Sequence, residues 1–226
     1  NSLKRVQYLE HVVYFVGLQS LYGGPSTRLR FQYAGRRGDS KGFSKGGFVT
    51  LGAQKLIEAT PIGGLSLKAV AAGAGGYDIT GMMNSIISRG SYNDPAYLAF
   101  MLHSYNAVNG WNRSMNEFFK PAYASRIASL LDGSSDAEAV NAQLSANPAS
   151  LLDATFYANM QNQNEEKQLK SALSANSLSN WGPKTATGMY QGTADATVFY
   201  ENSQLSLDRF KAAGSTSVTL TPVPGG

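Results

Sequence analysis

The chain has 226 residues, of which 42% are hydrophobic and 15% charged, which allows one hydrophobic core of moderate size and predicts a single domain. The absence of cysteine excludes disulfides, thiol catalysis and thiolate metal sites. No apolar run approaches the roughly 18 residues of a membrane-spanning helix, so we expect no transmembrane segment.

The first 45 residues concentrate positive charge, with eight Lys or Arg against two acids, a net +6 in a chain whose total is +4. Strands are plausible at 11–16 and 28–34, but the polar residues at 35–41 do not fit a buried strand. The residues that could form a nucleic-acid patch are Arg28, Arg30, Arg36, Arg37, Lys41 and Lys45, with Phe31 and Tyr33 as stacking groups. No RNA- or DNA-binding motif accompanies them and a solvated basic face is commoner, so we predict no nucleic-acid partner.

The segment Gly42–Gly46 reads G-x-S-x-G and precedes a helix-forming run that extends to Ala59. This pattern is typical of a nucleophile elbow, a tight turn that presents a serine at the N-terminus of a helix. Glycines stand two positions either side of the serine because larger side chains would collide with the neighbouring strand and helix. Ser44 is therefore a candidate nucleophile, and a plain glycine turn is the alternative in a chain with 24 glycines.

An apolar run at 65–72 predicts a buried parallel strand, and mostly helical residues follow it. The predicted helices lie at 95–109, 121–131, 136–146, 150–160 and 165–173. The glycines at 73–76 do not meet the G-x-G-x-x-G pattern of dinucleotide sites, and no metal-binding motif is present, so no cofactor or metal is expected. Aromatic residues of the helices, such as Phe118 and Phe119, fit either an acyl pocket or a packed core.

The C-terminal part follows the pattern strand, acid, helix, strand. It predicts a strand at 185–190, a turn that holds Asp195, a helix at 201–213 and a strand at 217–223. Asp195 is the candidate catalytic acid, because it ends a strand in a G-x-x-D turn. Glu201, at the start of the helix, is its rival.

Four segments together resemble the bacterial secretory-lipase-like branch of the α/β-hydrolases: Gly42–Gly47, Ala69–Asp78, Ser104–Trp111 and the stretch from Gly192 to Gly226. The resemblance implies an α/β fold with a mostly parallel sheet whose N-terminal strands are incomplete. It also implies one domain over 1–226, with a helical cap inserted at 77–183.

The same resemblance implies roles for individual residues. The triad of this fold runs serine, acid, histidine, which makes Ser44 the nucleophile and Asp195 the acid, while the backbone N–H of Lys45 contributes to the oxyanion hole. The histidine is expected beyond Gly226, because His11 precedes the serine and His103 lies on an apolar helical stretch. The chain is thus expected to be truncated at both ends, and the family suggests a secreted or periplasmic location.

The predicted function is hydrolysis of small-molecule or lipid carboxylic esters through an acyl-enzyme on Ser44. Two alternatives stay open. One is a peptidase or another acyl hydrolase on the same fold, and the other is a non-catalytic binding protein on a hydrolase scaffold, because the expected histidine is missing.

Overall fold

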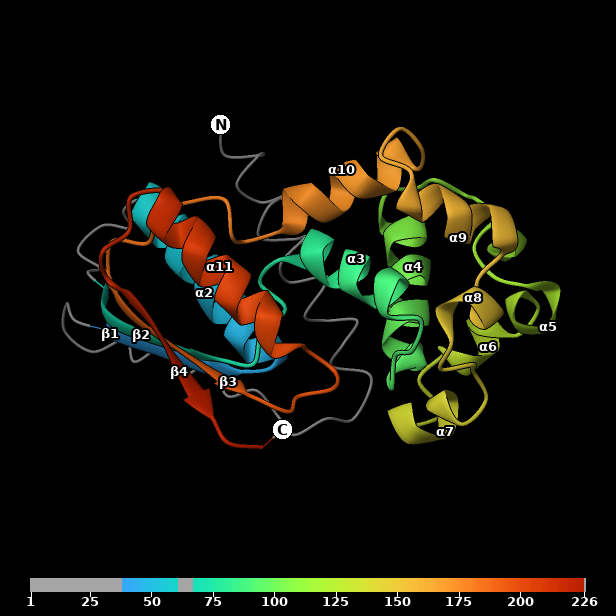
Figure 1. Ribbon diagram of the computed structural model, residues 1–226, viewed down its shortest axis with the longest axis horizontal. Helices are drawn as coiled ribbons and strands as arrows, with labels where there is room; N and C mark the ends of the chain where they lie inside the picture. Colours follow the sequence, from blue (N-terminus) through green and yellow to red (C-terminus); the bar gives the residue numbers. More distant parts are fainter. Residues whose placement is uncertain (1–37, 61–66, 226) are drawn as a thin grey trace. The chain divides into compact units, whose positions relative to one another are not determined.

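The computed structural model describes residues 38–60 and 67–225, which form two compact units (Figure 1). The sheet unit holds the described residues up to Ile79 and from Ser177 onward, and the helical unit runs from Thr80 to Asn176. The strands predicted at 11–16 and 28–34 lie outside the described residues, as do the basic residues before Gly38.

Four parallel strands form the sheet, in the order β1-β2-β3-β4. They are β1 Gly38–Phe43, β2 Leu67–Gly73, β3 Ala186–Gly192 and β4 Val218–Val223. Two long helices belong to the same unit, α2 Lys45–Ala59 after β1 and α11 Tyr200–Ala212 between β3 and β4. The predicted α/β class with a parallel sheet is confirmed.

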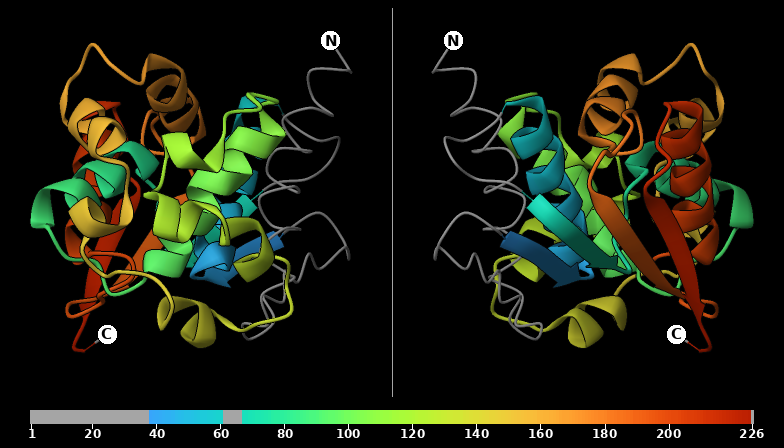
Figure 2. Two further views of the ribbon diagram at one scale, coloured as in Figure 1. Left: turned by 90° about the vertical axis from the view of Figure 1, so that its right-hand side faces the viewer. Right: turned by 90° about the vertical axis from the view of Figure 1, so that its left-hand side faces the viewer.

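Both long helices pack on one face of the sheet, as Figure 2 also shows. Alternate side chains of a strand share a face, so Thr187 and Gln191 of β3 point to the same side. Gln54 of α2 donates a hydrogen bond to Thr187 (2.9 Å), and Ser203 of α11 donates one to Gln191 (3.0 Å). The core of the unit lies between this face and the two helices, where Met189 is fully buried.

The strand β1 begins within the polar segment that the sequence did not favour as a buried strand. Its main chain pairs with β2 in register, from Asp39 opposite Ala69 to Phe43 opposite Gly73. Strand pairing uses backbone N–H and C=O groups, which polar residues carry as well as apolar ones. Residues 38–41 of the polar segment therefore belong to a strand, which side-chain polarity alone did not predict.

The helical unit is built from helices of very different lengths. They are α3 Ile79–Arg89, α4 Pro95–Val108, η1 Met115–Glu117, α5 Pro121–Ala124, α6 Ile127–Leu130, α7 Ala137–Asn141, α8 Pro148–Leu151, α9 Ala154–Gln161 and α10 Lys167–Asn176.

Several helices are shorter than predicted, and polar caps set where they begin. The helix expected at 136–146 is the five-residue α7, which Asp136 caps. The helix expected at 150–160 is divided between α8 and α9, because Asn147 caps the first and Asp153 the second. Asn and Asp side chains accept hydrogen bonds from the first free N–H groups of a helix, so they start new helices where periodicity alone suggests one long helix.

Two further differences concern where helices form. The helix expected at 121–131 is interrupted between α5 and α6, where Ser125 and Arg126 form a turn. The helix α3 was not predicted, since Gly81 lies near its start and lowers its propensity. Burial of its apolar side chains, including the fully buried Met83, stabilises it instead.

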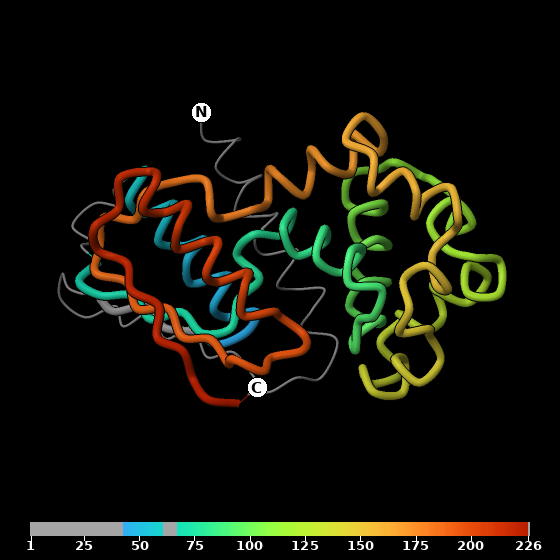
Figure 3. Tube along the Cα trace, in the orientation of Figure 1, coloured from blue at the N-terminus to red at the C-terminus, as the bar shows by residue number. Residues whose placement is uncertain are grey.

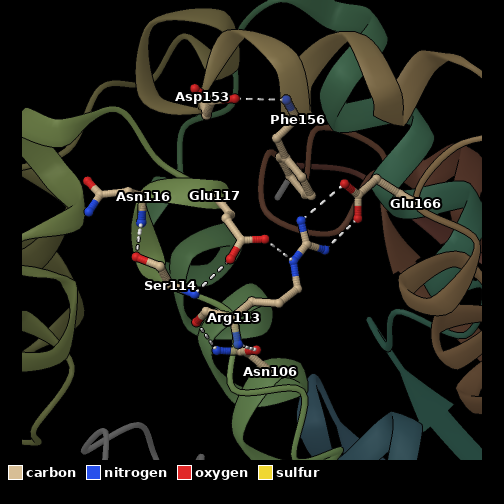
Figure 4. Close-up of polar contacts among 8 residues, drawn as sticks. All are labelled: Asn106, Arg113, Ser114, Asn116, Glu117, Asp153, Phe156 and Glu166. Atoms are coloured by element: carbon tan, nitrogen blue, oxygen red, sulfur yellow. Dashed lines mark hydrogen bonds and ion pairs between the residues drawn. The ribbon is translucent and has the colours of Figure 1, made fainter.

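Arg113 links three parts of the helical unit (Figure 4). Its guanidinium donates to both carboxylate oxygens of Glu166 (2.6 and 3.2 Å) and to one oxygen of Glu117 (2.9 Å). It also lies 4.4 Å from the ring centroid of Phe118. The side chain of Asn106 holds the backbone of Arg113 with two hydrogen bonds (2.9 and 3.0 Å). One planar side chain with several fixed donors thus joins η1 to the start of α10, and Asn106 ties the backbone of Arg113 to the end of α4.

The chain leaves the sheet unit after β2 and returns to it before β3, as the trace in Figure 3 shows. The two crossings meet inside the sheet unit. The N–H of Leu178 donates to the carbonyl of Tyr77 (2.7 Å), and the hydroxyl of Ser177 donates to the carboxylate of Asp78 (3.4 Å). We call these four residues the neck. The helical unit falls within the insertion predicted at 77–183, and its role as a cap stays a prediction.

Candidate active site

Ser44 lies in the turn between β1 and α2, at the carboxyl end of a parallel strand. Its backbone adopts φ 55° and ψ −120°, a region that residues other than glycine rarely occupy. Ser44 is exposed and occupies the N-cap position of α2, yet its hydroxyl makes no capping hydrogen bond. The turn therefore has the backbone geometry of a nucleophile elbow, with a serine hydroxyl that does not cap the helix.

A close approach to β2 fixes this turn. The N–H of Ser44 donates to the carbonyl of Gly73 at the end of β2 (2.7 Å). A Cβ at Gly47 would lie 2.3 Å from the same carbonyl oxygen, which no side chain permits. The sequence assigned the steric requirement to Gly42 and Gly46. The structure adds Gly47, whose role depends on β2 and is invisible in the five-residue motif.

Lys45 is the first residue of α2. Its backbone N–H is therefore one of the N–H groups at the start of the helix that have no carbonyl partner within the helix. These N–H groups carry the positive end of the helix dipole and favour negative charge beside them. Since α2 has no acidic residue in its first turn, no side chain of that turn competes for this position. The location suits an oxyanion that develops next to Ser44.

Asp195 lies three residues after the carboxyl end of β3, in a turn that holds its side chain firmly. Oδ1 accepts hydrogen bonds from the backbone N–H groups of Thr197 and Val198 (2.9 Å each). Oδ2 accepts one from the side chain of Gln191 (2.9 Å). The rival, Glu201, is exposed in the first turn of α11. Three hydrogen bonds therefore hold the Asp195 carboxylate in its turn.

The sheet brings the two candidate residues to the same end, where the carboxyl ends of its parallel strands lie. Ser44 follows β1 and Asp195 follows β3, and both strands run parallel to β2 between them. The end of β4 adjoins the acid, because Thr193 and Ala194 donate backbone hydrogen bonds to Val223 (2.9 Å) and Gly225 (2.8 Å). Loops at the carboxyl ends of parallel strands are where α/β proteins place their ligand sites.

The structure supports neither histidine of the chain as the partner of Asp195. His11 lies outside the described residues. His103 lies on α4, where burial lowers its pKa, and its Nδ1 atom is buried without a hydrogen-bond partner in the described part of the chain.

A buried polar group also shapes the loop after β2. The carboxylate of Asp78 is fully buried and pairs with Arg209 of α11 (2.7 Å). The side chain of Asn202 donates to the carbonyl of Asp78 (2.7 Å) and accepts from its N–H (3.2 Å). These contacts fix the loop to α11. The sequence motif at 69–78 contained Asp78, but gave no signal for its partners, which lie more than a hundred residues later.

Two of the predicted acyl-pocket residues are core residues. Phe118 and Phe119 are both fully buried in the helical unit. Phe118 packs edge-on against Phe156 with 5.2 Å between ring centroids. Of the two interpretations of these aromatics, the packed core is the one that the structure supports.

Other kinds of site find no support in residues 38–60 and 67–225. They contain no group of three or more His, Asp or Glu side chains that could hold a metal ion. No helix in this part of the chain is long and apolar enough to span a bilayer.

Solved structures with the same fold are esterases, lipases and related proteins. LipA, a rice cell wall degrading esterase from Xanthomonas oryzae, matches with a TM-score of 0.70 and 24% identity over 83% of this chain and 51% of LipA. A presumed hydrolase from Legionella pneumophila gives 0.74 and 20% over 84% and 50%. Candida antarctica lipase A in its closed state gives 0.58 and 12% over 84% and 44%.

These matches show that the chain has an α/β-hydrolase fold. The chain spans about half the length of each of these three proteins. No protein-family model and no curated protein matches the sequence.

Proposed function

We propose that this protein is a serine hydrolase of carboxylic esters, with Ser44 as nucleophile and Asp195 as the acid of its triad. The observation that carries the proposal is the backbone of Ser44, a non-glycine residue at φ 55° at the mouth of α2. Such strain is retained where function requires it. The resemblance to solved esterases and lipases favours hydrolysis over a binding role alone.

In the proposed reaction, the hydroxyl oxygen of Ser44 attacks the ester carbonyl carbon while a general base takes its proton. The carbonyl oxygen becomes an oxyanion, which the backbone N–H of Lys45 stabilises. The tetrahedral intermediate expels the alcohol, which receives the proton from the base. Water then attacks the acyl group on Ser44 by the same steps and releases the acid.

We place the base on a histidine that follows β4. In this order of triad residues the histidine comes last in the chain, after the acid. The end of β4 makes this position suitable, since Gly225 accepts a hydrogen bond from Ala194, the neighbour of Asp195.

The substrate class proposed is a small-molecule or lipid ester, and a secreted or periplasmic location belongs to the same proposal. A peptidase would use the same nucleophile and acid. Turnover of p-nitrophenyl esters against that of peptide amides separates the two.

Fluorophosphonate labelling of the whole protein tests the nucleophile. Wild type should be labelled at Ser44 and should hydrolyse p-nitrophenyl esters, and Ser44→Ala should lose both. The matched control is Ser114→Ala, because Ser114 is also an N-cap serine but its hydroxyl accepts a capping hydrogen bond from Asn116 (3.3 Å). That variant should keep labelling and turnover. Labelling that persists in Ser44→Ala excludes this assignment, and no labelling of wild type favours the binding protein.

The acid is tested in the same assay. Asp195→Asn should keep the fold but lower kcat by up to about four orders of magnitude, because the amide leaves the histidine in the wrong tautomer. Glu201→Gln is the control and should leave kcat within about twofold of wild type, since surface changes away from the chemistry have small effects. The reverse ranking would exchange the two roles.

A further inference from the structure

Gln191 is a polar residue at a position where a parallel strand normally buries apolar side chains. It lies on the helix-covered face of β3 with an exposed fraction of only 1%. A buried amide without hydrogen bonds costs stability, so a glutamine here must be satisfied by its neighbours. The hydrogen-bond partners of Gln191 show which groups it holds in place.

Every hydrogen-bonding atom of this amide is engaged. Nε2 donates to Oδ2 of Asp195 (2.9 Å) and to the carbonyl of Val198 (3.0 Å), while Oε1 accepts from the hydroxyl of Ser203 (3.0 Å). A carboxylate and a carbonyl only accept, which fixes the nitrogen end of the amide toward Asp195. Ser203 is itself fully buried on α11. The hydrogen bond from Ser203 thus fixes the orientation of the Gln191 amide.

The carboxylate is consequently held at both oxygens. Two backbone N–H groups hold Oδ1, and within the described residues Gln191 is the only side chain that donates a hydrogen bond to Oδ2. Each carboxylate oxygen can accept more than one hydrogen bond, so room remains for a histidine. Without Gln191, the turn backbone would still hold Oδ1, but rotation of the carboxylate would move Oδ2.

We propose that Gln191, supported by Ser203, is a positioning residue that orients Asp195 for the triad; this inference rests on the proposed function. It acts through Asp195 and touches neither substrate nor nucleophile. Its effect should appear in the transition state, when the base is positively charged and the oriented carboxylate stabilises it. A loss of Gln191 should therefore lower kcat and leave KM unchanged.

The first variant is Gln191→Leu, measured in the whole protein with a p-nitrophenyl ester. We expect kcat to fall about ten- to hundredfold, the range for loss of a hydrogen bond to a charged group. The matched control is Gln54→Leu. Gln54 is also fully buried and donates to a hydroxyl and a carboxylate, those of Thr187 and Glu58 (2.9 Å each), but Thr187 lies near the opposite end of β3. Both variants should lower the melting temperature, and only Gln191→Leu should lower kcat strongly.

The second variant, Gln191→Glu, gives a readout that a purely structural role would not produce. Two facing carboxylates repel when both are ionised, and they share a proton more readily as the pH falls. The ratio of variant to wild-type kcat/KM should therefore rise as the pH is lowered from about 8 to about 5.5. A ratio that is flat with pH, or equal losses of kcat in Gln191→Leu and Gln54→Leu, would overturn the positioning role.

Failure of this inference is distinct from failure of the proposed function. Labelling of wild type at Ser44 tests the function itself, independently of Gln191. A crystal structure of Gln191→Leu tests the inference without any assay: a rotated Asp195 carboxylate supports it. An unchanged carboxylate together with wild-type kcat contradicts it.

Discussion

Gly47 is the residue at which the elbow tolerates least change. Ser44 and Gly47 are both tied to the same carbonyl of Gly73, one by a hydrogen bond and the other by the absence of a side chain. The atom that a Cβ would meet belongs to the main chain of β2, so it cannot move aside as a flexible side chain does. Any side chain here must push α2 away from the sheet.

Gly47→Ala should therefore destabilise the protein by about 1–3 kcal/mol, the usual range for overpacking, and slow fluorophosphonate labelling of Ser44. Gly52→Ala is the control in the same helix, because its Cβ would meet only Leu178 at an ordinary 3.8 Å. That change should stabilise by about 0.5–1 kcal/mol, since alanine favours helix more than glycine. Urea unfolding and labelling rates measure both. A Gly47→Ala protein as stable as wild type would show that the helix shifts freely.

The role of a single residue was predictable from the sequence where all the residues that define that role lie in one short motif. The turn at Ser44 was identifiable because the glycines that it needs are sequence neighbours of the serine, and the catalytic role of Ser44 stays a prediction. Gln191 was not, since its meaning depends on Asp195, Val198 and Ser203, which the fold brings to it. The sequence offered one weak signal, a glutamine two positions from Met189 and so on the same face of the strand. Partners of buried polar groups are set by tertiary structure, which periodicity does not encode.

Among the elements of the sheet unit, the strands β2, β3 and β4 and the long helices were predictable, whereas β1 and the short helices of the other unit were not. Hydrophobic periodicity marks a long helix well, but a helix of four or five residues contains too little of the period. Caps such as Asp136 and Asp153 then decide the boundaries. In the helical unit, Arg113 clamps two short elements together, because its guanidinium donates hydrogen bonds to Glu117 and Glu166.

Arg113→Lys should lower the free energy of unfolding by about 1–3 kcal/mol, because a lysine keeps the charge but cannot bind both oxygens of Glu166 and Glu117 together. The control is Arg126→Lys, since the guanidinium of Arg126 donates one hydrogen bond to the carbonyl of Gln143 (2.8 Å). We expect about 0.5 kcal/mol or less for the control. Thermal unfolding measures both, and equal losses would show that the clamp adds nothing beyond charge.

Across the whole molecule, the two units carry ionisable groups that respond to acid in different ranges. In the helical unit, burial lowers the pKa of His103 from its ordinary 6.5. In the sheet unit, burial raises the pKa of Glu58, but hydrogen bonds from Gln54 and from the backbone of Thr185 and Lys184 lower it more, so it lies below 4.5. Both groups bind protons more readily in the unfolded chain than in the folded one. Both therefore reduce the free energy of unfolding as the pH is lowered.

The contribution of His103 should be complete above pH 6.5 and lost as the pH falls through its folded pKa, and that of Glu58 should be lost only below about pH 4.5. His103→Gln should thus flatten the stability profile as the pH falls below about 6.5, and Glu58→Gln should flatten it only below about pH 4.5. Urea unfolding across this range checks both. Each variant is the control for the other, and a profile identical to wild type would contradict the assignment.

The neck lets the inserted helices change during evolution with little effect on the sheet. Asp78 and Ser177 are 99 positions apart in sequence, yet their side chains are hydrogen-bonded. Because the crossings meet, the length of chain between them matters little to the sheet: each doubling of a flexible loop costs only about 0.6 kcal/mol of closure entropy. Helices can be added, removed or exchanged between these two residues while β2 and β3 keep their register. The two units are therefore free to diverge at different rates, and an exchanged helical insert is a natural route by which new sequences of this fold arise.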